Sequence, residues 1–176
     1  MAANGPDGRW LIGERAALVA LAVACIWGSA NAAHSNWRLA HDRSENACLD
    51  PYRWFLVSLG RPAVAAKGQI VTFETSGIAL YKDGTLFTKQ VLAGAGALVR
   101  ATPEGVEVDG RFLPYTERAI KRLAAAGAPL ARDQSHVYRV RDGEIFVIGT
   151  NPLSYDSRYY GPVPVSSVIG TARALW

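Results

Sequence analysis

Short apolar runs, separated by turn signals, dominate the chain from Tyr52 onward. The candidate strands are Trp54–Val57, Gln69–Phe73, Leu86–Val91, Glu144–Ile148 and Val168–Ala172. A further hairpin is predicted where Asp109-Gly110 joins Val106–Val108 to Arg111–Leu113, because Asp-Gly favours a tight two-residue turn. Strands this short and this often interrupted predict an antiparallel β domain.

One helix interrupts the strand pattern. Thr116 can cap a run from Glu117 to Ala126, and Gly127 follows as a stop signal. We expect this helix to be a small insertion that covers part of the β core.

An apolar segment, Ala16–Ala33, precedes the β region and contains no charged residue. Its length is at the low end of the roughly 17–25 residues that span a bilayer. Arg9 and Arg15 precede it, which favours an N-terminus in the cytoplasm and the remaining chain outside. A retained transmembrane helix and a signal peptide cleaved near Ala30-Asn31-Ala32 both fit the pattern.

These patterns divide the chain into four parts. Residues 1–15 are predicted to be a cytoplasmic N-terminus, residues 16–33 a transmembrane anchor, residues 34–47 a polar connector and residues 48–176 a periplasmic β domain. A length of 176 residues fits one domain with an appended segment.

Composition excludes two classes of function. The net charge is +4, but no dense Lys/Arg stripe with interleaved aromatic residues occurs, so we expect no nucleic-acid partner. His34, His41 and His136 have no cysteine or carboxylate at metal-ligand spacing, so no metal or other cofactor is predicted.

Lys89 is the first candidate for chemistry. It lies on the same face of a predicted strand as Phe87 and Val91. A lone lysine usually lies at the surface with its amine in water. The alternative is a lysine kept from water, whose neutral amine acts as a general base. Asp156 and Arg158 would by default form a loop salt bridge.

The C-terminal stretch GTNPLSYDSRYYGPV resembles the Ser-x-Asp-Ser-Arg box of type I signal peptidases. The similarity is greatest to the conjugative-transfer, TraF-type branch. The stretch TLFTKQVLAGAGALV resembles the lysine box of the same family. The resemblance covers the chain from Cys48 to Trp176. The apolar N-terminal segment in addition fits the family's membrane anchor.

The resemblance assigns roles to four residues. Lys89 matches the general base, Ser154 the serine that orients this lysine, and Asp156 with Arg158 a supporting ion pair. The fold it implies is a signal-peptidase-like antiparallel β domain.

The nucleophile departs from the family pattern, in which a serine stands in Ser-Leu/Met-Pro. Here Cys48 occupies that place in Asn46-Ala47-Cys48-Leu49-Asp50-Pro51, with one extra residue before the proline. Ser58 is the alternative. We favour Cys48, because a thiolate is the better nucleophile, and expect Asn46 or a backbone N–H to stabilise the oxyanion.

Three turn aspartates of the family are also missing, at Gln69, Ala97 and Thr150. The resemblance implies an endopeptidase in the bacterial inner membrane that cleaves an exported pilin-like precursor for the conjugative transfer machinery. Cyclisation of the product stays open beside hydrolysis. The missing aspartates support an alternative, a catalytically degenerate assembly factor of the transfer apparatus.

Overall fold

The computed structural model describes residues 18–25, 27–28, 36–60, 62, 65–128 and 136–176. The chain divides into two compact units, Met1–Trp37 and Arg38–Trp176. In the first unit residues 18–25 are helical, whereas residues 16–17, 26 and 29–33 of the predicted anchor lie outside the described residues. No helix in the described part of the chain has the length and apolar character needed to cross a membrane. The anchor therefore stays a prediction.

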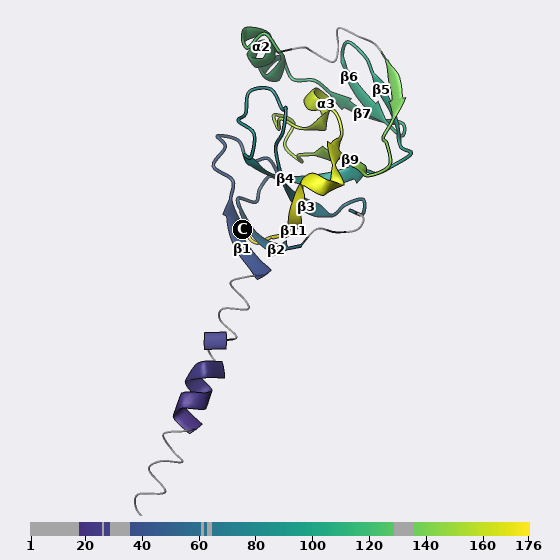
Figure 1. Cartoon of the computed structure of the whole chain (residues 1–176). Helices are drawn as coiled ribbons and strands as arrows, with labels where there is room; N and C mark the ends of the chain where they lie inside the picture. The colour runs from purple at the N-terminus through teal and green to yellow at the C-terminus, as the bar shows by residue number, and fades with distance from the viewer. Residues whose placement is uncertain (1–17, 26, 29–35, 61, 63–64, 129–135) are drawn as a thin grey trace, which may run out of the picture. The chain divides into compact units, whose positions relative to one another are not determined.

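Seven strands form the main sheet, in the order β1-β2-β11-β3-β4-β9-β10. Figure 1 shows β1 and β2 at one end of the second unit and β4 and β9 at its centre. The bounds are Trp37–His41 for β1, Trp54–Leu59 for β2, Ile70–Glu74 for β3, Leu86–Ala93 for β4, Glu144–Ile148 for β9, Val163–Pro164 for β10 and Val168–Ala174 for β11.

Four strands form a second sheet, in the order β7-β6-β5-β8. They are β5 at Leu98–Ala101, β6 at Gly105–Val108, β7 at Arg111–Pro114 and β8 at Val137–Arg139. Every pairing with a defined register is antiparallel, so the antiparallel β domain of the prediction is confirmed. The predicted hairpin joins β6 to β7, and both of its turn residues, Asp109 and Gly110, have positive φ angles.

The predicted helix is α2, Glu117–Ala125. The Thr116 hydroxyl accepts a hydrogen bond from the Ala119 N–H at its start, as the sequence pattern predicts. Ala119 and Leu123 are buried against the larger hydrophobic core, so the helix covers the β domain. Two short helices follow, α3 at Ser157–Tyr160 and the 3-10 helix η2 at Val165–Ser167.

Strand β9 lies between two hydrophobic cores. Ile145 and Val147 face the larger core, which contains residues of β3, β4 and α2. Phe146 and Ile148 face the smaller core, which also contains residues of β4 and of the second sheet. Burial on both faces accounts for the unbroken apolar run of this strand, where a half-exposed strand would alternate.

Part of the predicted connector, residues 34–47, lies in a strand. Residues 37–41 form β1, and the compact unit begins at Arg38, ahead of Cys48. The His41 ring stacks on the Trp54 ring, with 4.3 Å between centroids. Strand β1 is largely exposed, so its sequence carries little hydrophobic signal.

Candidate active site

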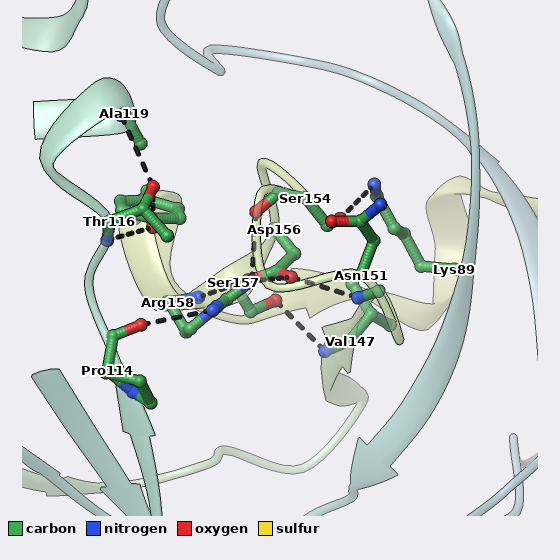
Figure 2. A network of polar contacts seen from close by, with 12 residues as sticks. Lys89, Pro114, Thr116, Ala119, Val147, Asn151, Ser154, Asp156, Ser157 and Arg158 are labelled. Carbon is green, nitrogen blue, oxygen red and sulfur yellow. Dashed lines mark hydrogen bonds and ion pairs between the residues drawn. The ribbon is translucent and has the colours of Figure 1, made fainter. Parts of the chain in front are cut away.

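Lys89 is fully buried on β4, on the face that Phe87 and Val91 share. Only 1% of the residue is exposed, so the surface interpretation does not apply. Its Nζ lies 5.4 Å from the centroid of the Phe87 ring and donates a hydrogen bond to Ser154 Oγ over 2.8 Å. Figure 2 shows the lysine reaching toward this serine from β4. Lys89 and Ser154, 65 residues apart, are therefore brought together.

The partner of Lys89 is a neutral hydroxyl. Among the described residues, no carboxylate forms an ion pair with its amine. The hydrogen bond to Ser154 Oγ therefore orients the amine on the buried face of β4.

Gly149 leaves the space in which Ser154 and the Cys48 carbonyl approach each other. It follows β9 directly, and Ile148 at the end of β9 pairs with Gln90 next to Lys89. A Cβ atom at Gly149 would lie 2.2 Å from Ser154 Oγ and 2.4 Å from the Cys48 carbonyl oxygen. Only glycine fits between these two groups.

A buried ion pair holds the segment that carries Ser154. Arg158 Nε and Nη2 each donate to one carboxylate oxygen of Asp156 over 2.8 Å, a two-point pair. The same guanidinium donates to the carbonyls of Ser154 and Pro114, and Asp156 Oδ2 accepts from the Gly149 N–H. Figure 2 shows Arg158 bridging from this segment to Pro114. The pair thus links β7 and the end of β9 to the serine that contacts Lys89.

Two residues to which sequence reasoning assigned no role complete this framework. Ser157 Oγ accepts a hydrogen bond from the Val147 N–H on β9. The Tyr159 hydroxyl accepts from the Thr116 N–H at the start of α2. Neither residue carries a separate sequence signal beyond its place in the C-terminal box.

Cys48 lies next to this framework in a closed loop. Its carbonyl accepts from the Asn151 N–H over 3.3 Å, and its own N–H donates to Asp42 Oδ2 over 2.7 Å. Its Sγ is 3.9 Å from the Ser44 hydroxyl oxygen. Cys48 is a free, partly exposed thiol.

Asp42 organises the Cys48 loop. Its carboxylate accepts hydrogen bonds from the Ser44 N–H and hydroxyl as well as from the Cys48 N–H. Burial acts to raise the pKa of Asp42, but the hydrogen bonds from Cys48 and Ser44 lower it below 3.8 overall. The carboxylate is therefore ionised at neutral pH. Sequence reasoning missed Asp42 and Ser44, because their roles arise from loop closure.

Ser58 lies on β2, away from Lys89. Ser58 pairs with Thr171 on β11, Thr171 with Val71 on β3, and Val71 with Lys89 on β4. Three strand spacings of 4.7–4.9 Å separate the two residues by roughly 14 Å. The structure therefore does not bring Ser58 to the lysine.

Cys48, Lys89 and Ser154 line one groove of about 700 Å³. Its apolar lining comes mainly from the strands, with Phe55, Val57, Leu59, Leu86 and Ile169. Helix α2 contributes Arg118, Ala119 and Arg122. No group of three His, Cys, Asp or Glu side chains that could hold a metal ion occurs in the described ranges.

The site combines an antiparallel β domain, a buried lysine and a Ser-x-Asp-Ser-Arg box that orients this lysine. Comparison with known proteins identifies the class of protein to which this combination belongs. Residues 12–176 match the family described as signal peptidase, peptidase S26, and the chain belongs to this family. Within it, the chain is similar to proteins named TraF.

The TraF-type relatives come from plasmid and conjugal transfer systems. A "Plasmid transfer protein TraF" of Escherichia coli is 37% identical over 88 residues, which is 49% of each chain. A "Conjugal transfer protein TraF" of Agrobacterium tumefaciens (strain 15955) is 34% identical over 88 residues, or 50% of this chain and 47% of that protein. The match spans about half the length of these curated relatives.

Among solved structures, a signal peptidase I from Enterococcus faecalis V583 is similar over 65% of this chain and 98% of that chain. The TM-score is 0.37 and the sequence identity is 22%.

Proposed function

We propose that this chain is a membrane-anchored processing endopeptidase of a conjugative transfer system, which cleaves an exported pilin-like precursor. The observation that carries the proposal is the buried Lys89 amine, 2.8 Å from Ser154 Oγ, in the groove that Cys48 also lines. The family supports a peptidase, and the names of the TraF relatives support a role in transfer.

In the proposed reaction Cys48 is the nucleophile and Lys89 the general base. The neutral Lys89 amine takes the thiol proton while the sulfur attacks the scissile carbonyl carbon. The peptide C–N bond then breaks, Lys89 returns the proton to the leaving amine, and a thioester remains. Water, or a substrate amine in the cyclising variant, gives its proton to Lys89 and displaces the thiol, which regains a proton.

Asn46 is the proposed donor to the oxyanion. The Cys48 N–H is already engaged by Asp42, whereas Asn46 lines the same groove. Its side-chain amide makes no hydrogen bond among the described residues. A donor directed at the developing negative charge is typically worth about 2.7–4 kcal/mol of transition-state stabilisation.

The test is a processing assay with the full-length chain in membranes and the pilin precursor of the same transfer system. Cys48→Ala and Lys89→Met should each lose processing, while Ser58→Ala should retain it. Normal cleavage by Cys48→Ala would assign the reaction to another nucleophile. Normal processing by Lys89→Met would leave only the non-enzymatic assembly factor.

Thiol alkylation gives an independent check of the nucleophile. Iodoacetamide should inactivate the wild-type chain, and it should equally inactivate a Cys25→Ser variant, in which Cys48 is the remaining cysteine. Full activity after complete alkylation of Cys48 would exclude the thiol mechanism.

The proposed location is the inner membrane, with a single span and the β domain in the periplasm. Two measurements test it. The full-length chain should stay with the membrane fraction after alkaline extraction, and protease added to spheroplasts should digest the β domain. Recovery of the chain in the soluble fraction would contradict the anchor.

A further inference from the structure

Arg53 ties the loop of residues 42–48, which carries the proposed nucleophile, to the main sheet. Its Nη1 donates hydrogen bonds to the Ser44 carbonyl over 2.8 Å and to the Asp42 carbonyl over 3.4 Å. Its Nη2 donates to the Glu45 carbonyl over 3.1 Å. The Arg53 carbonyl accepts a hydrogen bond from the Asp42 N–H over 2.8 Å. The side chain and the backbone of this one residue therefore both hold the loop.

The backbone of Arg53 is itself firmly held. Its N–H and the N–H of Trp54 both donate to the Trp176 carbonyl over 2.9 Å. Trp54 is the first residue of β2, and its ring stacks on that of His41 with 4.3 Å between centroids. The guanidinium thus extends from a fixed point of the main sheet, and a support of this kind keeps a reactive group in place.

Other contacts of this loop do not replace Arg53. The hydrogen bonds that the Asp42 carboxylate accepts come from within the loop, so they shape it without placing it on the domain. Glu45 pairs with Arg118 on α2, but both side chains are exposed, and such a pair contributes little. The Cys48 carbonyl accepts from the Asn151 N–H over 3.3 Å, which is long for a hydrogen bond.

The Arg53 side chain acts through the geometry of its donors. Among the described residues, it forms no ion pair with a carboxylate, and its hydrogen bonds go to backbone carbonyls. A guanidinium carries five N–H donors in a rigid planar fork, so it can hold several carbonyls at once. A lysine amine at the same position would supply the charge without the fork.

The placement of the loop sets how the two reacting groups meet. The hydrogen bond of the Lys89 amine goes to Ser154 Oγ, and the polar contact of Cys48 Sγ is with the Ser44 hydroxyl. No hydrogen bond joins the thiol directly to the amine in the described part of the chain. Their separation therefore depends on how the loop is supported. A displacement of 1 Å between reacting groups can cost about 100-fold in rate.

We propose that Arg53 is a positioning residue, which holds the loop of residues 42–48 so that Cys48 can react with the help of Lys89. This inference rests on the proposed function. Arg53 does not line the groove, so it acts on the reaction through the loop and not through contact with the substrate.

The first experiment measures kcat and KM of the full-length chain in detergent, with a peptide that spans the cleavage site of the pilin precursor. Arg53→Ala should lower kcat about 10- to 100-fold and change KM by less than about twofold, because the groove lining is unaltered. Arg139→Ala is the matched control. Arg139 also donates to a backbone carbonyl, that of Gly96, but it lies on β8 and does not line the groove. Wild-type kcat in Arg53→Ala, or an equal loss in Arg139→Ala, would overturn the inference.

Chemical rescue distinguishes positioning from a general loss of stability. Methylguanidinium, at a concentration that does not unfold the chain, should restore part of the kcat of Arg53→Ala, because it supplies the missing fork of donors. Methylammonium lacks this fork and should not restore it. A loss of kcat that methylguanidinium leaves unchanged would assign the effect to a rearranged fold and overturn the inference.

Alkylation of Cys48 separates this inference from the proposed chemistry. In a Cys25→Ser background, iodoacetamide should alkylate Cys48 at least about threefold faster when Arg53→Ala loosens the loop, and no faster with Arg139→Ala. Faster alkylation supports the role of Arg53 in placing the loop, even if the wild-type chain cleaves nothing and the proposed function fails. Alkylation at the wild-type rate overturns the positioning role, even where the wild-type chain cleaves the peptide.

Discussion

Gly149 shows how a single residue without a side chain sets the geometry of the site. It stands between Ser154 Oγ and the Cys48 carbonyl, both within 2.4 Å of where a Cβ would lie. One of these atoms belongs to the partner of Lys89 and the other to the proposed nucleophile. A methyl group there would separate the two halves of the site.

Gly149→Ala should therefore reduce activity by about 100-fold, since a displacement of 1 Å in a catalytic constellation costs about that factor. It should also lower stability by about 1–3 kcal/mol through overpacking. Gly94→Ala is the matched control, because no atom lies within 4 Å of its Cβ position. Processing rates and urea unfolding curves of both variants test this, and full activity of Gly149→Ala would contradict the geometry.

Asp42→Asn should destabilise the Cys48 loop in a pH-dependent manner. The pKa of Asp42 is lowered in the folded state, so its stabilisation is present above the ordinary value of 3.8 and is lost as pH falls through the folded pKa. We expect Asp42→Asn to lower the free energy of unfolding by about 1–2 kcal/mol at neutral pH.

Urea unfolding at pH 7 and near pH 3 measures this difference, which should shrink at the lower pH. Asp50→Asn serves as the control, because Asp50 is exposed and its side chain accepts no hydrogen bond from a described residue. A difference that is the same at both pH values would assign the effect of Asp42 to packing.

The sequence alone indicates some of the residues of the site. Alternation along β4 places Lys89 on the same face as Phe87 and Val91, and that face is the buried one. The pairing of Lys89 with Ser154 across 65 residues comes from the family resemblance and not from any local pattern. Asp42, Ser44 and the exclusion of Ser58 required the loop and the strand order.

Among the elements, the Asp156–Arg158 pair determines where α3, β9 and β7 meet. It joins the cap of α3 to the end of β9 through Gly149, and to the end of β7 through Pro114. Asp156 is 0% exposed, so neither charge can be solvated if the other is lost. The ion pair therefore fixes the position of Ser154.

Arg158→Met should destabilise the domain by about 3–5 kcal/mol, because it leaves a buried carboxylate unpaired. Lys121→Met removes an exposed ion pair with Glu117 and should cost at most about 1 kcal/mol. Adding Asp156→Asn to Arg158→Met should restore part of the lost stability. If Arg158→Met and Lys121→Met lowered the free energy of unfolding equally in urea, the buried pair would contribute no more stability than the exposed pair.

Element prediction succeeded where side chains alternate or turns are strongly specified. The strands β2, β3, β4, β9 and β11, the β6–β7 hairpin and α2 all follow the predicted order. The elements missed, β1, β5, β8, β10, α3 and η2, are short or exposed, and tertiary contacts outweigh their weak local preference. Strand β8 has only three residues, too few for a periodic signal.

The chain divides into two compact units, and the β domain lies in the second, Arg38–Trp176. The described residues of both hydrophobic cores all follow Arg38. A chain that begins at Asn36 keeps all of β1. Its free energy of unfolding in urea should equal that of the full chain within about 0.5 kcal/mol. Loss of the cooperative transition in the shortened chain would show that the first unit contributes to folding.

The two-sided burial of β9 has a consequence for the lifetime of the protein. When the domain opens, Ile145–Ile148 loses cover on both faces at once, and an uncharged, β-prone segment of this kind is a nucleus for aggregation. Arg141, Asp142 and Glu144 precede it and act as charged gatekeepers on one side only. We therefore expect the working lifetime at elevated temperature to follow the rate of opening more than the equilibrium stability.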